Sequence, residues 1–252
     1  MNTATTNITA VLLGKLGEAV QSIFQQKPLT GVEMHHDLNW VEPLDESSQH
    51  QKEEVLLLVT EAEALTPDML SRLGKRLPTM FTIVITVAPT DHVKVSTGKH
   101  QEVLATVDSM IVLPLSGGVS ASQDPALLAA IKQTMTYLIA LIQEALQGGV
   151  NVDFADVKTV IRSKRPSSVS VAKASGQDRV ALVTEQLFSS PYMVPGQAKD
   201  AARVLLQILS SAKAELEMDE LNDITDAIQE ACGEESEVIF GHSLEDLSLI
   251  HI

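Results

Sequence analysis

The sequence predicts an α/β protein. Short apolar runs with the length of buried strands alternate along the chain with segments that have helical spacing. The runs at 55–60 and 81–89 are continuously apolar, as expected of strands that are buried on both faces. A single long segment, 126–146, is apolar nearly all round and predicts a central helix that packs against partners on two sides. The sequence therefore predicts two α/β lobes that are joined by a long helix.

The first lobe shows the more regular alternation. A short apolar run at 8–13 ends at Gly14, and residues 17–24 follow with one apolar helical side. The later elements expected in this lobe are a short strand within 32–44, a strand at 55–60, a helix at 67–77, a strand at 81–89, a helix at 100–107 and a strand at 108–115. We predict an N-terminal domain of residues 1–125, followed by a central helix within 126–149.

The second lobe, residues 150–252, is predicted as a separate C-terminal α/β domain. It is expected to contain a helix at 154–163, a strand within 166–175, a helix at 178–190, strands at 202–209 and 213–218, a helix at 220–233, and two final segments at 236–243 and 247–252.

Composition and charge disfavour several classes of function. The 18 basic and 33 acidic residues give a formal charge of −15, which repels nucleic-acid backbones and anionic membranes. Cys232 is the only cysteine, so no internal disulfide can form, and "MNTATTN" lacks the layout of a secretory signal. We therefore expect a cytoplasmic protein that binds neither nucleic acid nor the membrane directly.

The stretch "NVDFADVKTVI", residues 151–161, resembles the synergy loop and following helix of FtsZ, the bacterial tubulin homologue. In that family the loop has the pattern Asn-x-Asp-x-x-Asp. Farther along, "SGQDRV", "LFSSPYM" and "VIFGHSLEDLSLIHI" are similar to later FtsZ segments in the same order, and residues 85–115 resemble the block before its central helix. Five ordered segments are harder to obtain by chance than one motif.

The resemblance implies a Rossmann-like GTP-binding lobe, a long central helix and a C-terminal α/β lobe with a mixed sheet. It also implies head-to-tail assembly, with an FtsZ-type subunit or with the chain itself, in which the synergy loop completes the GTPase site of a neighbour. Carried over, Asp153 and Asp156 would polarise the attacking water and Asn151 would help to place it. The residues alone allow a second interpretation, in which Asp153 caps the following helix and Asp156 is an acid of its first turn.

The main phosphate-binding loop of the family is not matched. FtsZ has a run of glycines and threonines after a buried strand, and its backbone N–H groups form a nest for phosphate. Here the strand at 55–60 runs into "EAEALTPDML", which has no glycine. Glu61 and Glu63 stand where phosphate oxygens would lie, and a unit-charge repulsion at ~5 Å is worth about 3 kcal/mol at an effective dielectric near 20. Thr66 is placed to cap the helix that follows, with Pro67 at its first position.

A reduced first glycine loop remains in "LLGKLGEAV". Gly14, Lys15 and Gly17 are the candidate nucleotide-binding residues, although the two glycines favour a tight strand-to-helix turn and Glu18 would repel a phosphate. Ala130 stands where the family usually has the aspartate that recognises guanine. We expect no cofactor, with GTP as the one candidate. We expect no metal either, because His35 and His36 are adjacent and point to opposite faces of a strand.

Three functions follow from these observations. The first is an FtsZ-like assembly partner that does not bind GTP itself and uses its synergy-loop face to modulate FtsZ-type filaments. The second is an active, polymerising GTPase with a rebuilt pocket, in which the catalytic site is completed between subunits. The third is a scaffold that reuses the fold for an unrelated partner. We predict the first, and therefore a pseudo-GTPase.

Overall fold

The computed structural model describes residues 7–25, 28–38, 54–76, 80–89, 98–115, 119–146, 152–162, 165–190, 192–193, 198–245 and 250–251. The chain divides into two compact units. The first unit comprises Met1–Ile139 and Arg162–Ser168, and the second comprises Ala140–Ile161 and Val169–Ile252. The long helix is shared between them, and the predicted boundaries near 125 and 150 stay predictions.

The first unit is built on a five-stranded sheet in the order β2-β1-β3-β4-β5, and all its described pairings are parallel. The strands are β1 (Asn7–Leu12), β2 (Val32–His35), β3 (Glu54–Val59), β4 (Met80–Pro89) and β5 (Ser109–Leu115). The central strands β3 and β4 are almost wholly buried, which explains their unbroken apolar sequences. The predicted Rossmann-like lobe is confirmed.

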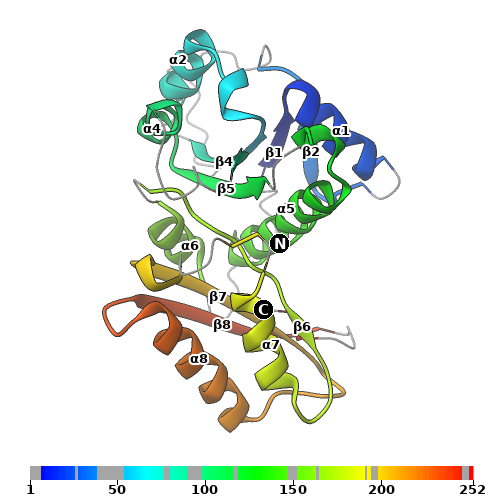
Figure 1. Cartoon of the computed structure of the whole chain (residues 1–252), viewed down its shortest axis with the longest axis vertical. Coiled ribbons are helices and arrows are strands. Elements are labelled where there is room, and N and C mark those ends of the chain that lie inside the picture. Colours follow the sequence, from blue (N-terminus) through cyan, green and yellow to red (C-terminus); the bar gives the residue numbers. More distant parts are fainter. Residues whose placement is uncertain are drawn as a thin grey trace, which may run out of the picture. The chain divides into compact units, whose positions relative to one another are not determined.

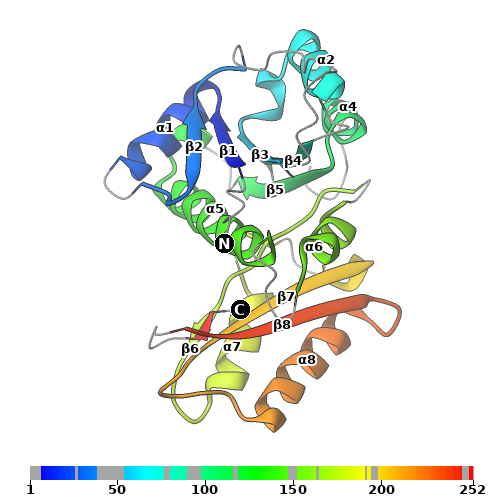
Figure 2. The same ribbon diagram turned by 180° about the vertical axis from the view of Figure 1, so that it is seen from behind.

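Helices lie on both sides of this sheet. They are α1 (Gly14–Phe24), α2 (Pro67–Arg76), α4 (Gly98–Thr106) and the first part of α5 (Pro125–Leu146), with single 3-10 turns η1 (Ala62–Ala64) and η2 (Ala121–Gln123). Figures 1 and 2 show α2 and α4 together on one side of the sheet and α1 on the other. In parallel sheets with such crossovers, ligands bind beyond the carboxyl ends of the strands. The turns β1–α1 and β3–α2 stand at these ends.

Helix α5 has 22 residues, as its apolar sequence predicts. It is the one helix among the described residues that is long and apolar enough to cross a membrane, but a core helix of a soluble protein satisfies the same criterion. Its side chains Leu127, Ile131, Met135, Ile139 and Ile142 are almost completely buried. We therefore interpret α5 as a core helix.

The second unit has a four-stranded mixed sheet in the order β6-β9-β7-β8. Its elements are α6 (Phe154–Ile161), β6 (Lys173–Ala174), α7 (Arg179–Phe188), η3 (Ala198–Asp200), β7 (Arg203–Ser211), α8 (Met218–Cys232), β8 (Glu237–Glu245) and β9 (Ile250–His251). Strand β7 pairs in parallel with β8, whereas β9 is antiparallel to β6 and β7. The prediction of a mixed C-terminal sheet is confirmed.

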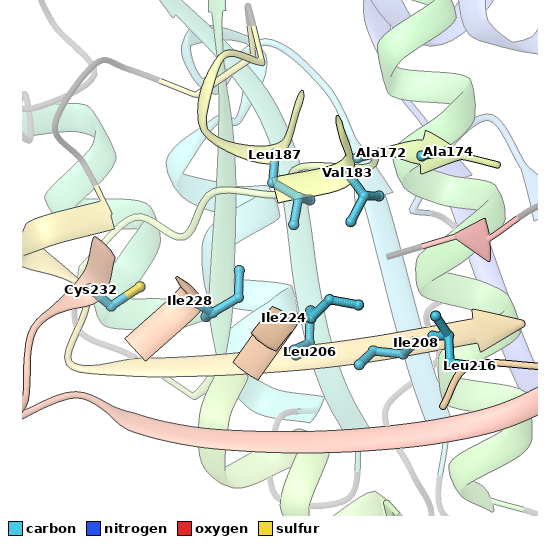
Figure 3. Packing of buried hydrophobic residues seen from close by; sticks show 10 residues of the cluster. All are labelled: Ala172, Ala174, Val183, Leu187, Leu206, Ile208, Leu216, Ile224, Ile228 and Cys232. Atoms are coloured by element: carbon cyan, nitrogen blue, oxygen red, sulfur yellow. The ribbon is translucent and has the colours of Figure 1, made fainter. Parts of the chain in front are cut away.

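The core of the second unit lies between β7 and the helices α7 and α8. Val183 and Leu187 of α7 and Ile224 and Ile228 of α8 are directed into one cluster beside β7 (Figure 3). Cys232 belongs to this cluster, and burial raises the pKa of its thiol. The interpretation of Cys232 as a small core residue is thus confirmed.

One predicted strand is much shorter than expected and another is wrong. Only Lys173–Ala174 within 166–175 is a strand, because the segment divides its contacts: Ser167 pairs with β5, whereas the Ser170 hydroxyl donates to the carbonyl of Leu187. The segment 213–218 is not a strand. The amide of Ala214 donates to the carbonyl of Ser211 in a tight turn, which ends the extended chain. Three residues later Glu217 becomes the N-cap of α8, so little chain remains for a strand.

Candidate functional site

The loop before α6 presents its carboxylates to solvent on an apolar anchor. Val152 and Phe154 are buried, and Val157 has no exposed surface. Between them Asp153 is exposed and Asp156 is partly exposed. The ammonium of Lys158 lies 4.8 Å from the centre of the Phe154 ring and covers it. Alternation of buried and exposed residues therefore holds the loop down while its acidic side chains face outward.

The two aspartates are fixed by reciprocal hydrogen bonds. The backbone amide of Asp156 donates to Asp153 Oδ1 at 2.8 Å, and the amide of Asp153 donates to Asp156 Oδ2 at 3.2 Å. This is the arrangement of a capping box, in which each side chain satisfies the other's backbone N–H. One oxygen of each carboxylate takes part, which leaves Asp153 Oδ2 and Asp156 Oδ1 as additional acceptors. The two interpretations of the sequence are therefore compatible, since a cap can also present an oxygen to water.

Removing the cap gives a direct test of this geometry. Asp153→Ala should lower the free energy of unfolding by about 1 kcal/mol, whereas Asp153→Asn should retain most of it because asparagine caps equally well. Asp178 is a matched control, because it precedes α7 without a side-chain cap hydrogen bond, and Asp178→Ala should have little effect. Urea unfolding of the variants measures the differences. Equal losses for Asp153→Ala and Asp178→Ala would contradict the cap.

Asn151, the third candidate of this loop, lies outside the described residues. Gly14, Lys15 and Gly17 lie in the first unit, whereas Asp153 and Asp156 belong to the second. The described candidate residues therefore form two separate half-sites, one in each unit.

The turn between β3 and α2 is closed by its own residues. Ala62 and Leu65 are buried, which anchors the turn by apolar contacts. The amide of Ala64 donates to the carbonyl of Glu61 at 2.9 Å, and the amide of Leu65 donates to that of Ala62 at 3.2 Å. These N–H groups therefore already have acceptors within the turn.

The start of α2 is also satisfied internally. The hydroxyl oxygen of Thr66 accepts from the amide of Met69 at 3.2 Å, and its carbonyl accepts from the amide of Leu70. Pro67 is the first helical residue, as predicted, and Asp68 forms an ion pair of 2.8 Å with Arg72. The predicted cap is confirmed. An anion at this helix start would have to displace Thr66 and approach Asp68.

The turn between β1 and α1 differs from the β3–α2 turn, because no side chain caps the helix that follows it. Leu13, which precedes α1, makes no side-chain cap hydrogen bond, and Lys15 is exposed. Gly14 has φ +66°, which favours glycine. A Cβ at Gly14 would lie 3.9 Å from Cβ of Ala64, so the η1 turn lies directly against this position.

Gly17 has a packing role. A Cβ added there would lie 2.4 Å from the carbonyl carbon of Leu12 and 2.9 Å from its oxygen. The third glycine of dinucleotide-binding turns has the same role of allowing close packing of helix against strand. Gly17 therefore supports the alternative of a tight strand-to-helix turn, independently of any nucleotide.

At several positions the structure shows burial or contacts that the sequence did not predict. Ala130, predicted to replace a guanine-recognising aspartate, is buried on α5. The stacking of Lys158 on Phe154 was not predicted, although their spacing of four residues on a helix was a usable signal. His35 and His36 have different partners, the carboxylate of Glu33 and the side-chain amide of Gln21.

Both the sequence and the fold of this chain are similar to those of known proteins. Residues 167–249 match the FtsZ family, C-terminal domain. The chain is 30% identical over 116 residues to the cell division protein FtsZ of Mycoplasmopsis pulmonis, covering 46% of this chain and 28% of that protein. It is 27% identical over 173 residues to FtsZ of Neisseria gonorrhoeae, covering 64% of this chain and 44% of that protein. The chain thus spans less than half the length of these relatives.

Solved structures show the same fold. An empty FtsZ dimer of M. jannaschii aligns with a TM-score of 0.64 and 11% identity, covering 98% of this chain and 86% of that chain. A GTPγS-form protofilament of Bacillus thuringiensis serovar israelensis TubZ aligns with a TM-score of 0.58 and 10% identity, covering 98% and 85%. The chain is therefore similar to FtsZ in part of its sequence and shares the fold of FtsZ and TubZ, and these neighbours in fold include proteins that were solved as a dimer and as a protofilament.

Proposed function

We propose that this chain is a cytoplasmic FtsZ-like assembly partner that does not bind GTP itself and modulates filaments or division by docking its α6 loop on an FtsZ-type subunit. One observation carries the proposal, namely the contrast between the two half-sites. In the β3–α2 turn the amides of Ala64, Leu65 and Met69 already have acceptors, and the turn carries Glu61 and Glu63. The α6 loop instead holds two carboxylates in a fixed and accessible arrangement.

The chemistry of the α6 loop suits an action on a neighbour's nucleotide. Hydrolysis of GTP needs an acceptor that orients a water in line with the γ-phosphate, and a carboxylate can provide it. The capping box fixes the side chains of Asp153 and Asp156, so little rotamer freedom has to be lost on docking. A subunit that docks by this face and offers no nucleotide of its own would cap one end of a filament.

Mixing experiments with FtsZ of Neisseria gonorrhoeae test this function. At an equimolar ratio, the chain should lower the light scattering of FtsZ filaments and raise phosphate release per docked subunit. Asp153→Asn together with Asp156→Asn keeps the capping oxygens, so the variant should still lower scattering but release phosphate about tenfold or more slowly. Asp178→Asn, which removes one carboxylate elsewhere in the second unit, should behave like the wild type. No change in either signal with the wild type would count against the proposal.

The β1–α1 turn favours one alternative, an active GTPase, because α1 begins without a side-chain cap and beside an exposed Lys15. Isothermal titration with GTP distinguishes the two functions. The assembly partner should give no heat of binding, whereas a rebuilt pocket should give heat that is lost in Lys15→Ala. If Asp153 and Asp156 prove dispensable and no GTP binds, a scaffold that reuses the fold is the remaining function.

A further inference from the structure

Strand β8 is an edge of the sheet in the second unit. It stands at the end of the order β6-β9-β7-β8, so among the described strands only β7 pairs with it. The register with β7 continues over all nine residues, from Glu237 to Glu245. Long edge strands offer unpaired N–H and C=O groups to a partner, and proteins usually protect them with lysine, proline or a bulge. β8 contains neither lysine nor proline.

Two large apolar side chains on β8 are exposed. Phe240 and Leu244 each expose 49% of their surface. Because side chains alternate along a strand, they share a face with Val238, which packs against the core cluster of α7 and α8. Figures 1 and 2 show α8 on this side of the sheet. This face of β8 is therefore covered near its start, whereas Phe240 and Leu244 stay about half exposed on either side of the partly buried His242.

The chain around this edge is strongly acidic. From Ala214 to Leu244 it contains ten acidic residues and no lysine or arginine. Within the part of the chain that the structure describes, two of the ten have cationic partners, since Glu220 pairs with Arg179 and Glu237 pairs with Arg203. Further acidic residues of α8 are exposed to solvent: Asp219, Asp223, Asp226 and Glu230.

We propose that β8 is a docking strand for an extended segment of another protein that carries lysine or arginine and alternating apolar residues. Such a segment would add to the free edge of β8 by backbone hydrogen bonds. Its apolar side chains would cover Phe240 and Leu244, and its cations would meet the acidic surface. This surface is distinct from the α6 loop, so the inference does not depend on the proposed function.

The acidic charge around β8 favours a basic segment over a second copy of the chain, a nucleic acid or a membrane. A second copy of the chain, paired edge to edge, would bring another strand from the same acidic segment against the first, and like charges at close range are unfavourable. Nucleic acids and anionic membranes would be repelled for the same reason. A basic, extended polypeptide is the occupant that satisfies the backbone, the apolar side chains and the charge together.

A synthetic probe tests the proposal. The probe is a nine-residue peptide that alternates lysine with valine and carries fluorescein, and its fluorescence anisotropy is followed as the full chain is added. The peptide should bind and slow hydrogen exchange at the amides of β8. Phe240→Lys combined with Leu244→Lys should weaken binding about tenfold or more. Leu182→Lys is the matched control, because Leu182 on α7 is exposed to a similar extent, and it should leave the affinity unchanged.

The control peptide has two central valines replaced by proline, which keeps the charge but removes backbone donors. Binding of both peptides with equal affinity would mean attraction by charge alone and would overturn the proposal. The proposal would also be overturned if the peptide did not bind, or if the double variant bound it with unchanged affinity. It would likewise be overturned if the wild-type chain formed a dimer that the double variant does not form. If circular dichroism shows that the double lysine variant does not fold, Phe240→Thr with Leu244→Thr replaces it, since threonine favours strands.

Discussion

Gly17→Ala is expected to destabilise the first unit severely, by about 3 kcal/mol. The new Cβ would lie 2.4 Å from the carbonyl carbon of Leu12, which is backbone and cannot rotate away. Relief therefore requires α1 to move away from β1, where Leu16 and Val20 are buried. Urea unfolding should show a lower midpoint, and thermal unfolding a lower Tm.

Gly74→Ala is the matched control for this variant. Gly74 lies inside α2, and an added Cβ would meet only Cγ2 of Thr106, at an ordinary contact distance of 3.8 Å. Alanine there should raise stability by about 0.5–1 kcal/mol, because glycine is a poor helix former. A stability of Gly17→Ala equal to that of the wild type would refute the packing role. Because the variant disturbs the fold, Lys15→Ala is the better variant in nucleotide assays.

Arg179→Met is expected to lower the stability of the second unit by about 2–4 kcal/mol. The Arg179 side chain is only 13% exposed and joins α7 to α8 through both carboxylate oxygens of Glu220. It also donates to the carbonyls of Ala214 at 2.8 Å and Glu215 at 3.0 Å. Methionine fills much of the volume but leaves the carboxylate and two carbonyls without these donors.

The exposed ion pair of Arg72 with Asp68 supplies the control. Its partners are four residues apart on α2 and 46% and 71% exposed, so Arg72→Met should lower stability by no more than about 0.5 kcal/mol. If urea unfolding finds similar small losses for both arginine variants, the bridge between α7 and α8 contributes little.

The same bridge gives an expected dependence on pH. Hydrogen bonding to Arg179, and then the bond from the amide of Glu217, lowers the pKa of Glu220 below its ordinary value of 4.5. A carboxyl whose pKa is lower in the folded state stabilises the fold above its unfolded pKa, and this contribution is lost as the pH falls through the folded pKa. The stability difference between the wild type and Glu220→Gln should thus be constant from about pH 7 to 5 and shrink below pH 4.5. A difference that does not change down to pH 3 would contradict this assignment.

Much of the first unit could be predicted because its strands are buried on both faces. β3, β4 and β5 begin and end within two residues of the apolar runs that predict them, since unbroken apolar sequence admits few other structures. The cap at Thr66 was predictable for a similar reason, because its hydrogen bond spans only three residues. The short strand within 166–175 and the missing strand at 213–218 have the opposite cause. There the chain's path depends on β5, α7 and a tight turn, which the periodicity of the segment does not contain.

The candidate site was predictable in part. The acidic loop at 153–156 and the absence of glycine at 61–70 were visible in the residues alone. The reciprocal hydrogen bonds between Asp153 and Asp156 were not, because the sequence allowed the cap without showing which oxygens it would use. The closed state of the β3–α2 turn also depends on the burial of Ala62 and Leu65, which only the surrounding sheet can provide.

By itself, the sequence determined the alternation of strands and helices, the long apolar α5, the acidic charge and the resemblance to FtsZ. These properties depend on residue type and on spacing along one segment, so they need no knowledge of distant partners. Only the tertiary structure decided that Gly17 packs on Leu12, that Arg179 joins Glu220, and that β8 is an edge strand. Such contacts join residues that are far apart in the sequence. The periodicity of one segment carries no information about which distant residues the folded chain brings into contact with it.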